Sequence, residues 1–255
     1  MINVLAPRHG AILEQYAWSN VLLAFDFDGT LSPIVRDRHA AGMRRSTWRL
    51  LGAVCALYPC AVISGRSRSD VAERLAGLPV RYVVGNHGLE PNGAMPRFAK
   101  AAAAMQDHLE GRLADAQGVE LEDKLYSLAI HYRKSRAKRA AKRVIMDAVA
   151  SCPIAHRIVP GKLVFNLLPE GAPHKGIALR DLRKKAKVDT AIYVGDDVTD
   201  EDVFQMEDPG VLGIRVGADA KSAASYCVRD QRTVDRLLAK LVTLRTEAGT
   251  RSARA

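Results

Sequence analysis

Cysteines and aromatic residues are scarce in this sequence of 255 residues, which contains four cysteines and 5% aromatic residues. The cysteines stand at positions 55, 60, 152 and 227 and form no Cys-x-x-Cys pair. This spacing disfavours both a zinc site built on cysteine and a framework of disulfide bonds. Free thiols are typical of a reducing compartment, so we expect a cytoplasmic protein.

Long apolar runs are also missing, since none approaches the roughly 18 residues that a membrane span requires. Residues 1–20 lack the basic stretch and apolar core of a secretory signal. We therefore expect no membrane partner. The composition, with 48% hydrophobic and 26% charged residues, is typical of a globular protein, and the length suits one large domain or two modest ones.

Basic residues outnumber acidic ones, giving a net charge of +10. Nucleic-acid binding is disfavoured because so few aromatic residues accompany the basic ones. An anionic small-molecule substrate fits the same charge. Residues 124–143 contain eight Lys or Arg and no acid, which we interpret mainly as a solvated helix face. A non-catalytic module that binds nucleic acid remains the remote alternative.

Apolar runs alternate with helical patterns over much of the chain, which predicts an α/β fold with a parallel sheet. Ligand sites in such sheets lie beyond the carboxyl ends of the strands. Three of the runs end in polar, Gly-containing segments. The predicted strands are 21–29, 60–66, 80–88, 190–197 and 211–217, and the predicted helices are 8–19, 44–58, 69–78 with Ser69 as its N-cap, 175–186, 200–206 and 233–248.

The alternation is interrupted in the middle of the chain, where we predict an inserted α+β domain at 93–172. Its pattern is a helix, strand-like alternation, a second helix and a hairpin with Pro-Gly at the turn. The predicted segments are 98–117, 119–133, 135–151 and 156–169. A discontinuous core would then comprise 1–92 and 173–248, followed by a disordered tail at 249–255.

Paired acids end two of the predicted strands, Asp26 with Asp28 and Asp196 with Asp197. Carboxylates that converge on one point repel each other unless a cation lies between them. Oxygen ligands of this kind suit Mg²⁺, so these acids predict a magnesium site. Lys175 would offset the remaining negative charge and hold a phosphoryl oxygen.

These residues stand in four ordered motifs, "DFDGT", "ISGR", the lysine of "HKG" and "GDDVTDED", which resemble those of the haloacid dehalogenase-like phosphotransferases. The resemblance implies that Asp26 is the nucleophile and Asp28 the general acid and base. It also implies that the backbone carbonyl of Asp28, rather than its side chain, meets the metal. The implied metal ligands are Asp26, Asp28 and Asp196, with Asp197 and Asp200 as further candidates.

Three small residues complete the expected phosphate site. Ser64, after the second strand, can donate a hydrogen bond to a phosphoryl oxygen. Gly29 permits close backbone approach. Thr30 offers a hydroxyl that we expect to steer Asp28.

Longer stretches of the sequence are similar to the trehalose-6-phosphate phosphatase family, including "GNHG", "SLAIHYR" and "YVGDDVTDEDVF". That similarity implies a Rossmann-like core with an inserted α+β cap, and hydrolysis of trehalose 6-phosphate to trehalose and phosphate. The sequence does not give the oligomeric state, and we favour a monomer. It also implies that cap residues contact the sugar. With two loop residues of the core, the expected substrate contacts are Arg66, His87, Glu122, Lys124, Arg133, Lys162 and Asn166.

Two positions depart from the family pattern. Asn166 stands where the pattern has Glu, and Leu168 where it has Arg. A lost polar contact can weaken discrimination between sugars. The alternative substrates are therefore related sugar phosphates, namely a glucosyl- or mannosyl-phosphoglycerate or a sucrose phosphate.

Overall fold

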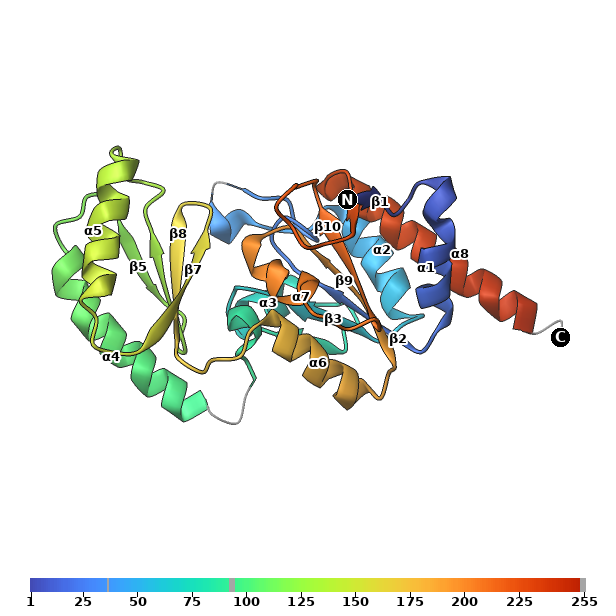
Figure 1. The fold of residues 1–255 in the computed structure, drawn as a ribbon, viewed down its shortest axis with the longest axis horizontal. Helices are drawn as coiled ribbons and strands as arrows, with labels where there is room; N and C mark the ends of the chain where they lie inside the picture. Colours follow the sequence, from blue (N-terminus) through green and yellow to red (C-terminus); the bar gives the residue numbers. More distant parts are fainter. Residues whose placement is uncertain (36, 92–94, 253–255) are drawn as a thin grey trace. The chain divides into compact units, whose positions relative to one another are not determined.

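The computed structural model describes residues 1–35, 37–91 and 95–252. The chain divides into two compact units (Figure 1). The first comprises Met1–Gly88 and His174–Ala255, and the second comprises Leu89–Pro173. The first unit is thus built from two separate stretches of chain. Among the helices in the described ranges, none has the length and hydropathy that a membrane crossing requires.

The first unit contains a seven-stranded sheet in the order β1-β11-β10-β9-β2-β3-β4, with every neighbouring pair parallel. This confirms the predicted α/β fold with a parallel sheet. The strands are β1 (Ile2–Asn3), β2 (Val21–Phe25), β3 (Cys60–Ile63), β4 (Tyr82–Val84), β9 (Thr190–Gly195), β10 (Val211–Val216) and β11 (Tyr226–Val228).

Helices cover both faces of this sheet, which explains why β2 is apolar at every position. Leu23 and Phe25 pack into one hydrophobic cluster and Leu22 and Ala24 into another. A strand buried on both faces reads as a continuous apolar run. The first cluster includes α1 (Gly10–Trp18), α2 (Arg45–Cys55), α3 (Arg68–Arg74) and α8 (Val234–Ser252), and the second includes α6 (Lys175–Ala186) and α7 (Glu201–Phe204).

Three local predictions in this unit were wrong. The short strands β1 and β11 were not expected, because two or three residues carry no readable alternation. The N-cap of α3 is Ser67, whose hydroxyl accepts from the Asp70 backbone N–H, and not Ser69. Helix α8 continues to Ser252 instead of ending at 248, because one Gly weakens a helix without ending it. Residues 253–255 of the expected tail lie outside the described residues.

The second unit contains a four-stranded antiparallel sheet in the order β5-β6-β8-β7. Side chains from one sheet face pack with α4 and α5 into a separate hydrophobic cluster. Residues 119–133 form two strands joined by a tight turn. The elements are α4 (Met95–Leu113), β5 (Glu120–Asp123), β6 (Leu128–His131), α5 (Lys138–Ala150), β7 (His156–Gly161) and β8 (Val164–Pro169).

The β7–β8 hairpin turns after Pro160 and Gly161, and not at these two residues as predicted. Pro160 and Gly161 belong to β7, and the turn is made by Lys162 and Leu163. Leu163 adopts a positive φ of 64°. Pro160 is tolerated in β7 because that strand lies at the edge of the sheet.

Candidate active site

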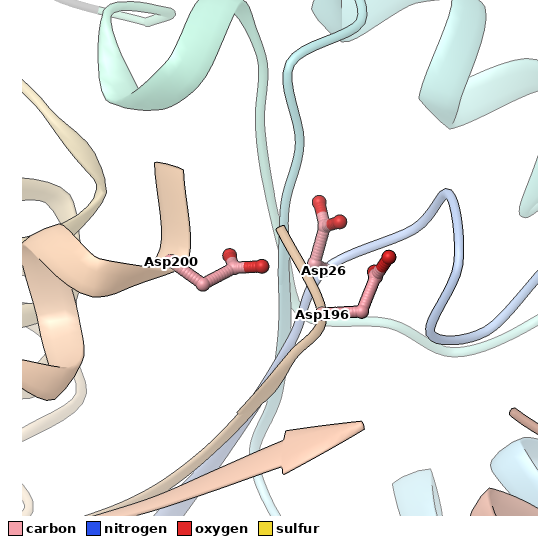
Figure 2. A group of neighbouring side chains, drawn as sticks. All are labelled: Asp26, Asp196 and Asp200. Atoms are coloured by element: carbon pink, nitrogen blue, oxygen red, sulfur yellow. The ribbon is translucent and has the colours of Figure 1, made fainter. Parts of the chain in front are cut away.

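Two neighbouring strands bring the principal acids together. β2 pairs with β9 in parallel, with Phe25 opposite Val194, so Asp26 and Asp196 emerge at the same sheet edge. Asp200 reaches the same place from the turn that follows β9 (Figure 2). One carboxylate oxygen of each of these three aspartates lies within 4.8 Å of the others. This acidic cluster has the oxygen donors and the spacing to hold a metal ion.

Lys175 supplies the positive charge within the cluster. It is the first residue of α6 and is 1% exposed. Its Nζ lies 3.0 Å from Asp26 Oδ1 and 2.7 Å from Asp200 Oδ1. Burial alone would lower the pKa of Lys175, but Asp200 and Asp26 outweigh it and raise that pKa. The ammonium therefore remains charged and bridges two buried carboxylates.

Asp200 is held from three sides. Besides the Lys175 ammonium, it accepts hydrogen bonds from the Tyr193 hydroxyl at 2.6 Å and from the Asp197 backbone N–H at 2.8 Å. The Asp197 side chain accepts from the Val198 N–H and caps the short helix η4 (Val198–Asp200), so it lies outside the cluster of three. Sequence reasoning missed Tyr193, because within an apolar strand a tyrosine reads as a core residue.

Gly29 and Thr30 both lie against the Asp196 carboxylate. Gly29 has a φ of +89°, and a Cβ there would lie 2.0 Å from Asp196 Oδ2. Only glycine leaves room for that carboxylate. The Thr30 hydroxyl donates to Asp196 Oδ1 at 3.1 Å. The expectation that Thr30 steers Asp28 was therefore wrong: the turn at Gly29 points the hydroxyl toward the neighbouring strand end.

Two acids of the cluster, Asp26 and Asp196, resist ionisation. Burial, followed by the charges of Asp200 and Asp197, raises the pKa of Asp196 to about 7. Burial is also the largest influence on Asp26, and it raises the pKa of that group well above its usual range despite Lys175. One buried ammonium does not neutralise three carboxylates, so the donor set fits an additional cation.

The loops after β3 and β4 contribute further polar groups at this edge. Ser64 directly follows β3 and is 1% exposed. Its carbonyl accepts from the N–H of His87, which lies in the 3₁₀ turn η3 (Asn86–Gly88) with a φ of 58°. A Cβ on Gly65 would lie 2.4 Å from the His87 ring. The Arg66 guanidinium binds the carboxylates of Asp28 and Asp70.

The five expected substrate residues of the second unit lie on or beside its sheet. Glu122 and Asn166 flank Ala129 in the strand register, on the face opposite to Leu128 and Leu167 of the hydrophobic cluster. This places them on the face that α4 and α5 do not cover. The polar contacts here are Glu122 to His131 at 2.7 Å, Lys124 Nζ to Asn166 Oδ1 at 3.1 Å and Arg133 to the Lys162 carbonyl at 3.2 Å.

Comparison with solved structures shows which fold this chain has. The fold matches the C-terminal domain of trehalose-6-phosphate phosphatase from Candida albicans with a TM-score of 0.79, at 22% identity over 92% of this chain and 96% of that one. It also matches a trehalose-6-phosphate phosphatase related protein with a TM-score of 0.71, at 23% identity over 89% of this chain and 99% of that one. These two likenesses show that the chain shares the fold of these solved proteins.

Sequence relationships give the family. The trehalose-phosphatase family model matches residues 24–231. Trehalose-phosphate phosphatase from Mycobacterium ulcerans is 34% identical over 246 residues, which cover 86% of this chain and 62% of that relative. The chain thus spans less than two thirds of the length of this relative. The chain belongs to the trehalose-phosphatase family, as its motifs predicted.

Proposed function

We propose that this protein hydrolyses trehalose 6-phosphate to trehalose and phosphate through an aspartyl-phosphate on Asp26. The observation that carries the chemistry is the buried contact of 3.0 Å between Lys175 Nζ and Asp26 Oδ1 at the carboxyl ends of the strands. Membership of the trehalose-phosphatase family supports the substrate. The names of two relatives, the trehalose-phosphate phosphatases of Mycobacterium ulcerans and Mycobacterium bovis, point the same way.

The reaction divides into two displacements. An oxygen of Asp26 attacks phosphorus, the bond from phosphorus to the sugar oxygen breaks, and Asp28 gives that oxygen a proton. Water then attacks the phosphorus of the aspartyl-phosphate and loses a proton to Asp28. The bond from phosphorus to the Asp26 oxygen breaks, phosphate leaves, and both acids are restored. Lys175 holds Asp26 in place and balances charge on the phosphoryl oxygens. The hydroxyl of Ser64 and the turn at Gly29 would complete the phosphate site.

We further propose that the metal is Mg²⁺. Asp26 and Asp196 would hold it with the backbone carbonyl of Asp28, because hard oxygen donors suit this ion. When bound, Mg²⁺ neutralises negative charge on the substrate phosphate. Asp200 would support the site indirectly, by holding Lys175 in place, because its own oxygens already accept hydrogen bonds from Lys175, Tyr193 and Asp197.

A panel of phosphorylated sugars tests the substrate. We expect trehalose 6-phosphate to give the highest kcat/KM, with turnover that depends on Mg²⁺. The panel should include sucrose phosphate and glucosyl- and mannosyl-phosphoglycerate, because Asn166 already accepts from Lys124 and has no carboxylate to offer a sugar. Phosphate release measures each reaction. Faster turnover of any other member would refute the substrate assignment and leave the phosphatase chemistry standing.

Stabilisation by Mg²⁺ should grow as the pH rises. The pKa of Asp196 is raised to about 7, so between about pH 4 and 7 the folded protein holds a proton that the unfolded chain lacks. Without metal, stability therefore falls as the pH rises through this window. Mg²⁺ relieves the repulsion only after that proton has left. We expect a larger rise in Tm on adding Mg²⁺ at about pH 8 than at about pH 5.5.

An Asp196→Asn variant serves as the control for this measurement. It lacks the titrating group, so its Mg²⁺-induced rise in Tm should be small at both pH values. A rise in the unmodified protein that is equal at both pH values, or larger in acid, would contradict the assignment of the metal to this cluster.

A further inference from the structure

Asp28 is gripped by a single arginine on both of its oxygens. Arg66 Nε donates to Asp28 Oδ2 at 2.5 Å, and Arg66 Nη2 donates to Asp28 Oδ1 at 2.8 Å. A planar fork on a planar carboxylate fixes the direction of both groups. Asp28 follows β2 on a loop, and its side chain is 38% exposed.

Arg66 is itself anchored on the protein. Its Nη1 donates to Asp70 Oδ2 at 2.7 Å and its Nη2 donates to the Arg38 carbonyl at 2.9 Å. Its guanidinium also lies over the Phe27 ring, 5.8 Å from the centroid. Only 11% of the side chain is exposed. The donors of Arg66 are thus directed to protein acceptors.

Asp70 is anchored in turn by a second arginine. Its Oδ1 accepts from Arg74 Nε at 2.9 Å, and its backbone N–H donates to the Ser67 hydroxyl. Burial alone would raise the pKa of Asp70, but Arg66 and Arg74 outweigh it and lower that pKa, so Asp70 stays ionised. Arg74 also donates to the carbonyls of His39 and Ala41. Asp28, Arg66, Asp70 and Arg74 form a chain of alternating charge, which we term the Asp28–Arg74 ladder.

We propose that this ladder aims the Asp28 carboxyl at the leaving sugar oxygen, and that Arg66 is a positioning residue instead of a substrate contact. The proposal rests on the proposed function, in which Asp28 protonates that oxygen as the bond to phosphorus breaks. A general acid acts only within hydrogen-bond reach of the atom it protonates. When Asp28 carries the proton, its second oxygen still accepts from Arg66, so the aim is kept.

The leaving group provides the test. An alkoxide leaving from a sugar phosphate needs a proton, whereas the p-nitrophenolate of p-nitrophenyl phosphate leaves readily as an anion. The quantity to measure is kcat/KM, because it reports the steps up to the first irreversible one, formation of the aspartyl-phosphate. Arg66→Lys keeps the charge and removes the planar fork. We expect this variant to lose about 10- to 100-fold on trehalose 6-phosphate and less than about 3-fold on p-nitrophenyl phosphate.

A double-mutant cycle with Asp28→Asn separates positioning from substrate binding. If Arg66 acts through Asp28, Arg66→Lys costs nothing further on trehalose 6-phosphate once Asp28 is Asn. If Arg66 binds the substrate, its loss persists in that background, or appears as a raised KM with kcat kept. Either of these last results would overturn the proposal, as would equal losses on the two substrates.

Two further variants guard the result against folding artefacts. Asp70→Asn leaves Arg66 in place and weakens its anchor, so it should shift the ratio of the two kcat/KM values in the same direction by a smaller factor. Arg183 of α6 forms an ion pair with Asp208, and Arg183→Lys, which disrupts that pair, should leave the ratio unchanged. A shift in the Arg183→Lys ratio, or none in Asp70→Asn, would count against the ladder.

Failure of the substrate assignment gives a different result. If trehalose 6-phosphate is inert and another alkyl phosphate of the panel is hydrolysed, the same comparison is made with that compound, and the ladder stands or falls on it. If only p-nitrophenyl phosphate is hydrolysed, no leaving group requires a proton from Asp28, and the proposal is overturned.

Discussion

Replacing Asp26 with Asn will abolish phosphate release and leave the protein folded. The amide nitrogen and oxygen are too weakly nucleophilic to form the aspartyl-phosphate, so kcat should fall by at least about 10⁴-fold. Asp26 is a buried carboxylate whose pKa is raised mainly by burial. Removing its charge takes away an unfavourable group, so the Tm of the metal-free variant should be unchanged or higher.

Phosphate release and thermal unfolding should be measured on the same Asp26→Asn preparation. Asp208→Asn provides a matched control, since it makes the same chemical change in a pair with Arg183 away from the acidic cluster. That control should keep its activity and lose some stability. An Asp26→Asn protein that retained more than about one hundredth of the activity would exclude Asp26 as the nucleophile.

Replacing Lys175 with Met should damage both stability and activity. Lys175 is 1% exposed and bridges Asp26 and Asp200, so its loss leaves two buried carboxylates without their common partner. Breaking a buried pair in this way costs about 3–5 kcal/mol of unfolding free energy. Loss of a cation beside the transferring phosphoryl group should also lower kcat by about 10²- to 10³-fold.

Added Mg²⁺ separates the two effects of Lys175→Met. The ion should restore part of the Tm, because it supplies positive charge to the cluster, but it should not restore kcat. Lys184→Met is the control, since it makes the same change at an exposed position of the same helix and should alter neither quantity much. A Lys175→Met protein with normal stability and rate would show that the bridge is dispensable.

The meeting of Asp26 with Asp196 followed from the sequence alone, although 170 positions separate them. Parallel strands present their carboxyl ends at one edge, so two apolar runs that end in acids must converge if the strands are neighbours. The continuous apolar character of β2 and β9 made that prediction firm, because only central strands are buried on both faces.

The partners of individual side chains could not be predicted in the same way. Whether Thr30 reaches Asp28 or Asp196 depends on the backbone turn at Gly29, and a positive φ redirects every following group. Likewise, nothing in the sequence predicted that the Arg66 guanidinium would bind Asp28 and also Asp70 of α3. Such contacts are decided by the local geometry of loops, which residue type and spacing do not encode.

The chain leaves the first unit at Gly88 and re-enters it at His174, and these two points touch. A Cβ on Gly88, which has a φ of +111°, would lie 2.6 Å from the backbone of His174. The 85 intervening residues therefore form an insertion whose two ends connect to the first unit at adjacent points. Replacing this insertion would not interrupt any strand of the parallel sheet. The second connection point, His174, directly precedes Lys175. A replacement of the insertion must therefore preserve the backbone that holds the Lys175 ammonium against Asp26. The inserted unit can thus be exchanged only if the first turn of α6 keeps its conformation.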